Sequence, residues 1–240
     1  MATRDFLLEI GTEELPPIAL EGLSRALESS LCAQLSSAGL DYSGSARFAT
    51  PRRLAVLVSD LGESQPDRTI ERFGPAVSAA FDSDGKATPA ALGFARSCGV
   101  SVDALARADK DGVEKLLFHG EEKGAASSSL LPAMVQEAVN RLPVPKPMRW
   151  GIGREEFVRP VHWIVMLFGS ETLSANILGQ AAGNQTWGHR FHHNVAIALS
   201  DPGDYEKALD QARVIASFSR RRDRVRELVI AQADQLGARA

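Results

Sequence analysis

The spacing of apolar residues near the start of the chain changes abruptly, and the change predicts a strand followed by a helix. Residues 4–10, RDFLLEI, form a short apolar run that ends at Gly11, as is typical of a buried strand. In residues 16–39 leucines recur at intervals of three and four, so one face of a helix is apolar. The prolines at its start lack an N–H that would be unpaired there, and Gly39 ends the helix.

Comparable patterns along the remaining chain predict a mixture of strands and helices. Short apolar runs predict strands at residues 45–50, 52–61, 114–122, 161–169, 172–179, 196–200 and 213–217. Helical spacing predicts helices at residues 87–99, 127–142, 203–212 and 219–238, and the polar residues 62–68 predict a loop. We expect 45–50 to pair with 52–61, and 161–169 with 172–179, as hairpins. Because no regular βαβ order is present, the prediction is an α+β fold with a mixed sheet.

Composition and charge narrow the class of protein only slightly. The chain has 240 residues, of which 44% are hydrophobic and 24% charged, as in ordinary globular proteins. Its net charge of −3 provides no global basic field for nucleic acid. The halves differ, however. Residues 1–140 carry 13 basic and 20 acidic side chains, a net charge of −7, whereas residues 141–240 carry 14 and 10, a net charge of +4.

The cysteines and the hydropathy of the chain predict a cytoplasmic protein. Cys32 and Cys98 are far apart and form no CxxC motif, which favours reduced thiols. The first residues have no long apolar core, so a secretory signal is not expected. No apolar run reaches the roughly 18 residues that a membrane span needs, so we expect no membrane partner.

The stretch EIGTEELPP, residues 9–17, allows two interpretations of its glutamates. Two neighbouring carboxylates in different environments can divide acid and base roles. Alternatively, Thr12, Glu13 and Glu14 lie just before a helix, where side-chain oxygens and negative charge stabilise free N–H groups. Capping accounts for every residue of the stretch, so it is the favoured interpretation, and no catalytic residue is predicted.

Several strings, in conserved order along residues 5 to about 225, resemble the β subunit of bacterial glycyl-tRNA synthetases of the α2β2 type. They are FLLEIGTEELPP (6–17), FATPRRLAV (48–56), QPDRTIERFGPAV (65–77), PVPKPMRWG (143–151), FVRPVHWIVMLFG (157–169) and GHRF (188–191). Because the β chain of that family is much longer, the resemblance implies that this chain is an N-terminal fragment.

The resemblance implies a share in the ATP-dependent attachment of glycine to tRNA(Gly). In that family the α subunit carries the class II adenylation core, so the implied partners are the α subunit and tRNA(Gly) in an α2β2 heterotetramer. ATP with Mg would serve the complete enzyme, and no cofactor is expected in this fragment. Consistent with this, the chain contains no GxGxGxxR, GxxxxGK[ST] or GxGxxG string.

The same resemblance implies a division into domains. Residues 1–217 would form an α+β domain similar to the B3/B4 domain of the phenylalanyl-tRNA synthetase β chain. Residues 218–240 would be the first helix of a following helical, HD-like domain. Two alternatives to a tRNA-binding and assembly role remain open: an editing hydrolase acting on mischarged tRNA, and a pure protein-interaction module.

Basic residues within the family-like strings are the candidates for tRNA contact. Guanidinium groups bind phosphates through paired hydrogen bonds, and aromatic side chains stack on unpaired bases. The candidates are Arg52, Arg53, Lys146, Arg149, Arg159, His189 and Arg190, interleaved with Phe157, Trp163, Trp187 and Phe191. The alternative is that the aromatic residues pack in the core while the arginines pair with acids.

Two further clusters receive less weight. His189, His192 and His193 would need to share one face to hold a metal, and their neighbours favour a strand or turn, so no metal site is predicted. Residues 219–227, SRRRDRVRE, place five arginines at a helix start, where they oppose the helix dipole. Their partner is expected to be acidic protein surface, RNA or solvent.

Overall fold

A computed structural model describes residues 2–238, which divide into two compact units. The first unit comprises the chain up to Gln65 and from Ala125 onward, and the second is Pro66–Gly124. Sequence patterns had not indicated this insertion. Within the described residues, no helix combines the length and the hydrophobicity needed to cross a membrane.

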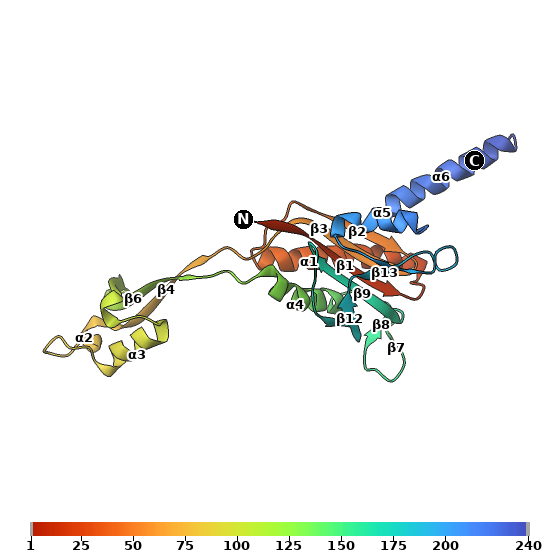
Figure 1. Ribbon diagram of the computed structural model, residues 1–240. Coiled ribbons are helices and arrows are strands. Elements are labelled where there is room, and N and C mark those ends of the chain that lie inside the picture. The colour runs from red at the N-terminus through yellow and green to blue at the C-terminus, as the bar shows by residue number, and fades with distance from the viewer. Residues whose placement is uncertain (1, 239–240) are drawn as a thin grey trace. The chain divides into compact units, whose positions relative to one another are not determined.

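The first unit is built on a seven-stranded mixed sheet in which β1 is central (Figure 1). The strand order is β11-β12-β9-β1-β3-β2, with β10 also pairing with β9. Its strands are β1 (Thr3–Thr12), β2 (Gly44–Thr50), β3 (Arg53–Gly62), β9 (Val161–Phe168), β10 (Glu171–Thr172), β11 (Asn176–Ile177) and β12 (Gln180–Gly183). β1 is antiparallel to both β3 and β9, whereas β12 is parallel to β9. The predicted α+β class with a mixed sheet is therefore confirmed.

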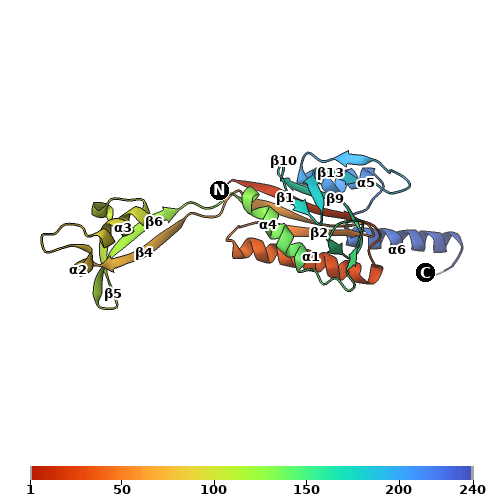
Figure 2. The ribbon, with the colours of Figure 1, turned by 90° about the horizontal axis from the view of Figure 1, so that it is seen from below.

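Helices cover both faces of this sheet (Figure 2). They are α1 (Pro17–Ser37) and α4 (Ser127–Asn140) on one face and α5 (Tyr205–Gln211) on the other. A further helix, α6 (Phe218–Gln235), extends away from the sheet and buries none of its residues. Alternation along β1 directs Phe6, Leu8 and Ile10 into the core with α1 and α4. Leu7 faces the opposite way and packs in a second core with residues of α5, including Tyr205. The side chains of the sheet are therefore buried on both faces, which explains the continuous apolar run in β1.

The leucine stripe predicted for the first helix is confirmed. Its five leucines are all buried in the core shared with the sheet, namely Leu20, Leu23, Leu27, Leu31 and Leu35. Burying a leucine side chain contributes about 1.5–3 kcal/mol relative to leaving it exposed, so this face supplies much of the force that holds α1 on the sheet.

Short hairpins and single turns complete the first unit. They comprise β7 (Met148–Arg149) with β8 (Glu156–Phe157), β13 (Gln185–Trp187) with β14 (Ala196–Ala198), and the 3-10 turn η2 (Pro202–Asp204). The strand predicted at 196–200 is thus present in shorter form. The helices predicted at 203–212 and 219–238 correspond to α5 and α6.

The second unit is a three-stranded sheet with two helices and a 3-10 turn. Its elements are β4 (Arg68–Ala76), α2 (Val77–Ala80), α3 (Pro89–Cys98), η1 (Val102–Ala104), β5 (Ala106–Lys110) and β6 (Val113–Glu122), and the strand order is β4-β6-β5. A small core that includes Ala80, Ala91, Ala95 and Leu116 holds it together. The predicted helix 87–99 and strand 114–122 are confirmed, whereas β4 and β5 were not predicted.

One predicted element is present only in part, and one is wrong. The predicted hairpin of 161–169 with 172–179 begins as expected, because Thr172 of β10 pairs with Leu167 of β9. It does not continue as one strand, because Leu178 and Gly179 adopt positive φ angles of 52° and 77° and turn the chain between β11 and β12, and β12 then pairs with β9 in parallel. Residues 213–217 are not a strand, because Arg213 has a positive φ of 65° at the end of α5. Val214 and Ala216 in that segment still pack against the sheet, which explains their apolar character.

Candidate functional site

A buried ion pair lies at the base of the site. Glu9 on β1 is 0% exposed, and Arg53, at the start of β3, is 2% exposed. Nη1 of Arg53 lies 3.6 Å from Oε1 of Glu9. The β1–β3 register pairs Arg53 with Gly11, so Glu9 is its diagonal neighbour on the same face of the sheet. Each charge offsets the desolvation of the other, which would cost several kcal/mol for an unpaired ion.

Polar groups of three other residues complete this pair. The hydroxyl of Thr186 accepts a hydrogen bond from Nη1 of Arg53 at 3.3 Å and lies 2.8 Å from Oε1 of Glu9, to which it donates. Nε1 of Trp163 donates to the same carboxylate at 2.6 Å. Nη2 of Arg53 donates to the carbonyl of Trp187 at 2.7 Å. Together these bonds join β1, β3, β9 and β13 through side chains.

Gly11 provides the space for this arrangement. A Cβ atom built on Gly11 would fall inside the indole ring of Trp163, its cross-strand neighbour on β9. The guanidinium carbons of Arg52 and Arg53 lie 6.0 and 5.8 Å from the centre of that same ring. Trp163 therefore occupies the space that a side chain at position 11 would need, and both guanidinium groups lie within cation–π distance of its ring.

The capping interpretation of Glu13 and Glu14 is wrong. The N-cap of α1 is Pro16, which has no side-chain capping bond, and no acidic residue lies in the first turn. The prolines separate the two acids from the free N–H groups of the helix. Both acids instead face basic side chains contributed by other elements.

Glu13 and Glu14 form an ion-pair network with Arg190. Its Nη1 lies 2.6 Å from Oε1 of Glu14 and 3.4 Å from Oε2 of Glu13. Glu13 also lies 3.0 Å from Nε2 of His162 and 3.8 Å from Arg52. A hydrogen bond to its backbone holds the pKa of Glu14 below its usual range, and Arg190 lowers that pKa further. Glu14 is therefore a carboxylate at neutral pH.

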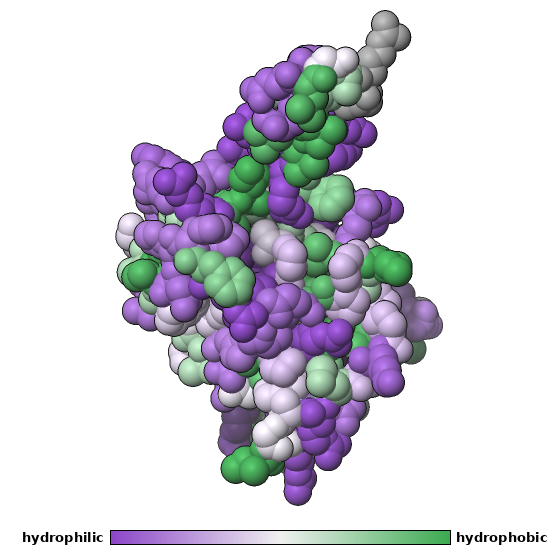
Figure 3. All heavy atoms as spheres, turned by 90° about the vertical axis from the view of Figure 1, so that its right-hand side faces the viewer, coloured by the Kyte–Doolittle hydropathy of each residue, from purple (hydrophilic) through white to green (hydrophobic). Residues whose placement is uncertain are grey.

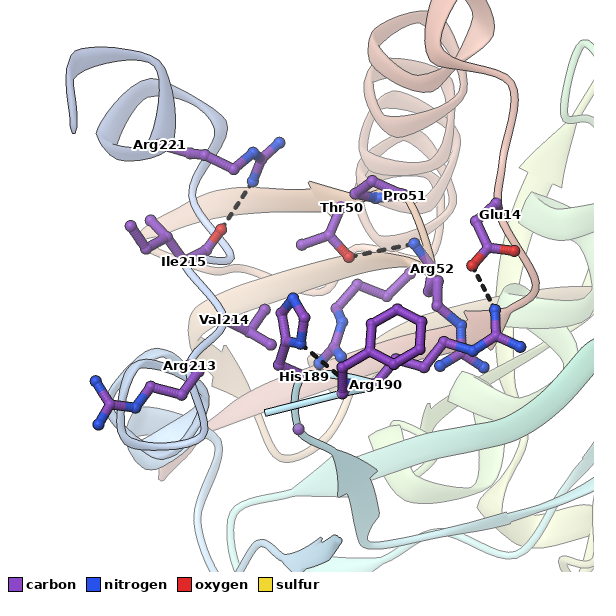
Figure 4. Close-up of a pocket in the computed structure, with 13 residues that line it drawn as sticks. Glu14, Thr50, Pro51, Arg52, His189, Arg190, Arg213, Val214, Ile215 and Arg221 are labelled. Carbon is purple, nitrogen blue, oxygen red and sulfur yellow. Dashed lines mark hydrogen bonds and ion pairs between the residues drawn. The ribbon is translucent and has the colours of Figure 1, made fainter. Parts of the chain in front are cut away.

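A cavity of about 320 Å³ opens beside this network (Figure 4). The turn between β2 and β3 contributes Thr50 and Pro51, and the loop between β13 and β14 contributes residues 188–191. The segment after α5 and the first turn of α6 close the other side. Five arginines line the cavity, namely Arg52, Arg53, Arg190, Arg213 and Arg221, against one acid, Glu14. The lining is therefore basic and suited to an anionic ligand.

The seven predicted candidates fall into three groups. Arg52, Arg53, His189 and Arg190 are brought together around the cavity. Arg159 lies beside it, where its Nε donates to the carbonyl of Glu14 at 3.0 Å. Lys146 lies before the β7–β8 hairpin and Arg149 lies in it, and both are outside the cavity lining. Arg149 pairs with Glu156 at 2.7 Å.

The cavity candidates differ in how much of each side chain remains free for a ligand. The guanidinium of Arg53 is committed to Glu9, Thr186 and Trp187, and it has almost no exposed surface. Arg52 is partly buried, and its Nε has no hydrogen-bond partner among the described residues. Arg190 is more exposed, and among the described residues its ion pairs are those with Glu13 and Glu14. Arg52 and Arg190 are thus the better placed to receive an anion.

His189 organises the β13–β14 loop. Its Nδ1 accepts hydrogen bonds from the backbone N–H groups of Phe191 and His192, both at 3.2 Å. The backbone N–H of His189 donates to the carbonyl of Ala212 at 2.9 Å. Among residues 2–238, no group of three potential ligands gathers in a way that could hold a metal ion, and the three neighbouring histidines are no exception.

Arg221 is a cavity residue that the sequence analysis did not single out. Its Nη2 donates to the carbonyl of Ala49 at 2.7 Å. Its Nη1 donates to the carbonyl of Ile215 at 2.8 Å, as Figure 4 shows. Burial lowers the pKa of this guanidinium. The neighbouring Arg220 pairs with Glu206 and Asp210 of α5, so acidic protein surface partners this arginine. The arginine-rich run was the available signal, but it could not tell which arginine faces the cavity.

Sequence comparison places the chain among the aminoacyl-tRNA synthetases. A family model described as the glycyl-tRNA synthetase beta subunit matches residues 6–240, and the chain belongs to this family. It is 51% identical to the glycine–tRNA ligase beta subunit of Chromohalobacter salexigens over 98% of its length, and 48% identical to that of Hahella chejuensis over 100%. The corresponding protein of Coxiella burnetii is 47% identical over 99% of the chain. The chain spans 34–35% of the length of these relatives.

Proposed function

We propose that this chain is the N-terminal part of a glycine–tRNA ligase β subunit. With an α subunit that carries the adenylation site, the β subunit would support the ATP-dependent attachment of glycine to tRNA(Gly). The family membership and the names of the relatives support this proposal. ATP and Mg would bind elsewhere in the complete α2β2 enzyme. The enzyme would be located in the cytoplasm.

The contribution of this region would be to bind tRNA through the basic cavity. The observation that carries the proposal is that five arginines line one cavity whose described lining includes a single acid. Arg52 and Arg190 would contact backbone phosphates, because guanidinium groups bind phosphate oxygens in pairs. Lys146, Arg149 and Arg159 remain candidates for further contacts beyond the cavity.

We also propose the finer division of the chain that the resemblance implies. Residues 1–217 would form the B3/B4-like domain, and 218–240 would begin an HD-like helical domain. In support of the second part, none of residues 218–235 that form α6 is buried. The exposed apolar side chains of α6 include Val225, Leu228, Val229 and Ile230, and Figure 3 shows apolar surface along this helix at the top of the view. Such a face suits burial against further helices.

The test is tRNA binding by the complete α and β enzyme across a range of salt concentrations. Arg52→Ala and Arg190→Ala should each weaken binding for any tRNA sequence, and each should reduce the salt slope by about one. Arg141→Ala is the matched control, because Arg141 is exposed and its ion pair within residues 2–238 is with Glu137 on α4. If both cavity variants retain the affinity and slope of this control, Arg52 and Arg190 do not contact tRNA phosphates and this part of the proposal is wrong.

A deacylation assay with mischarged tRNA distinguishes the editing alternative. We expect the complete enzyme to release no amino acid through this region, since the chain supplies binding groups and no assigned catalytic residue. Loss of such a deacylation activity in the Arg190→Ala variant would instead favour the editing hydrolase.

A further inference from the structure

One of the four aromatic residues interleaved with the basic candidates stands apart. Phe157 is buried, Trp163 packs over Gly11, and Trp187 is 36% exposed. Phe191 is 83% exposed, although a phenyl ring in water forgoes the stabilisation that burial would bring. The structure therefore presents this ring to solvent beside the cavity that it helps to line.

The loop that carries Phe191 is held in place by its own hydrogen bonds. His189 accepts bonds from two successive N–H groups, and the N–H of His193 donates to the carbonyl of His189 at 2.8 Å. A Cβ atom on Gly188 would collide with the carbonyl oxygen of His193, so the loop closes tightly at its base. The exposure of Phe191 is thus a property of a well-defined loop.

The surroundings of the ring favour a nucleic-acid ligand. The guanidinium carbon of Arg190 lies 6.0 Å from the centre of the Phe191 ring, and the ring of His189 lies 6.2 Å away at an interplanar angle of 52°. Figure 4 shows His189 and Arg190 beside Arg52, and Arg221 across the cavity. An apolar protein partner would have to desolvate these cations, whereas the backbone of RNA would neutralise them while a base covers the ring.

We propose that Phe191 is a stacking platform for one unpaired base of a bound RNA. The base would lie on the exposed face of the ring, and the phosphates on either side of it would reach Arg190 and Arg52. The inference rests on the proposed function, and it adds that the RNA is single-stranded at this point, because a base within a duplex cannot cover the ring.

The test compares Phe191→Leu, which is apolar but not aromatic, with Phe191→Trp, which keeps an aromatic face. Binding of tRNA to the complete α and β enzyme should weaken roughly 5- to 100-fold in the leucine variant, the range measured for loss of one stacked base. The tryptophan variant should bind within a few-fold of the original protein. The salt slope should stay unchanged in both, because no phosphate contact is lost.

Nucleotide-resolution protection mapping provides a second readout. A single unpaired nucleotide should lose its protection in Phe191→Leu and regain it in Phe191→Trp. Ile18→Ala is the matched control, because Ile18 is 99% exposed and lies on α1, outside the cavity lining. Equal thermal unfolding midpoints for all variants would confirm that the loop substitutions act on binding.

Failure of this inference is distinguishable from failure of the proposed function. If Phe191→Leu binds tRNA as the original protein does, the stacking proposal is wrong, even if the arginine variants weaken binding. If Phe191→Leu weakens assembly with the α subunit and leaves tRNA affinity intact, Phe191 is a protein contact and the proposal is also overturned. If only the arginine variants leave binding unchanged, the phosphate contacts fail and the stacking platform stands.

Discussion

Nη1 of Arg53 lies 3.6 Å from Oε1 of Glu9, and neither side chain has appreciable contact with solvent. The pair links the central strand of the sheet to the strand beside it. Since its polar groups are shared with Thr186 and Trp163, it also holds the first residues of the β13–β14 hairpin against the sheet. Arg53 thereby fixes the positions of the neighbouring Arg52 and of the loop between β13 and β14, although its own guanidinium is buried and not free to bind a ligand.

Removing one member of this pair should destabilise the fold strongly. Arg53→Met is expected to lower the free energy of unfolding by about 3–5 kcal/mol, because Glu9 would remain buried without its counter-ion. Adding Glu9→Gln should recover part of that loss. Urea denaturation measures both effects. Arg141→Ala, which breaks an exposed ion pair, should change the free energy by about 0.5 kcal/mol or less. Similar small losses for Arg53→Met and Arg141→Ala would contradict the assigned role.

Tyr205 should make stability depend on pH in the alkaline range. Burial, and then the charge of Glu9, raise the pKa of Tyr205 well above its ordinary value of 10.0. The unfolded chain loses this proton near pH 10 while the folded chain keeps it, so stability is complete below pH 10 and falls as pH rises further. Tyr205→Phe should remove that part of the decline, measured as unfolding free energy between pH 8 and about pH 11.

At neutral pH the same Tyr205→Phe variant should be nearly as stable as the original protein. The hydroxyl of Tyr205 is buried and has no hydrogen-bond partner of good geometry among the described residues. Replacing it by hydrogen therefore removes little that stabilises the fold. An unchanged alkaline slope in this variant would assign the pH dependence to other groups.

Gly11 should not tolerate even one additional methyl group. Gly11→Ala would place Cβ inside the indole ring of Trp163, and the forced displacement should lower the unfolding free energy by about 1–3 kcal/mol. Gly44→Ala is the matched control, because Gly44 lies in β2 and its Cβ would meet no atom within 4 Å. Tryptophan fluorescence should also shift in the Gly11 variant alone. Equal stability of the two variants would show that Trp163 moves aside freely.

Glu14 should oppose RNA binding and should not act as a helix cap. Glu14→Gln removes the one acid among the described residues of the cavity lining and frees Arg190 from an ion pair. We expect tRNA affinity to rise, with a steeper salt dependence, while the unfolding free energy changes little because no capping bond is lost. Reduced affinity would contradict the opposing role of Glu14, whereas a loss of helix stability would restore the capping interpretation.

The elements that could be predicted from the sequence are those whose burial imposes a regular spacing. The leucines of α1 and the apolar run of β1 are examples, since each buries side chains at every turn or on both faces. β4 escaped prediction because its residues are mostly exposed or half-buried, so its pairing with β6 leaves little hydrophobic pattern. The turn at Leu178 was missed because a leucine rarely adopts positive φ, and nothing local announces it.

The candidate site could be predicted as a set of residue types and only partly as an arrangement. Four of the seven candidates meet at one cavity, since the family-like strings that contain them lie at the same end of the sheet. The register of β1 and β3 determines that Arg53 is buried beside Glu9, its diagonal neighbour, while Arg52 faces the cavity. Such pairing between distant segments has no signature in a single sequence. The RNA-binding role of these residues stays a prediction.

Arg221 belongs at once to the cavity wall and to the root of α6. Its guanidinium fastens the first turn of that helix to the carbonyls of Ala49 and Ile215. An anion that binds this guanidinium competes with those two carbonyls for its N–H groups. It would therefore change the relative free energies of different orientations of α6. By thermodynamic reciprocity, whatever holds α6 in a given direction must change the affinity of the cavity by the same factor. Arg221 would thus couple ligand binding in the cavity to the orientation of α6.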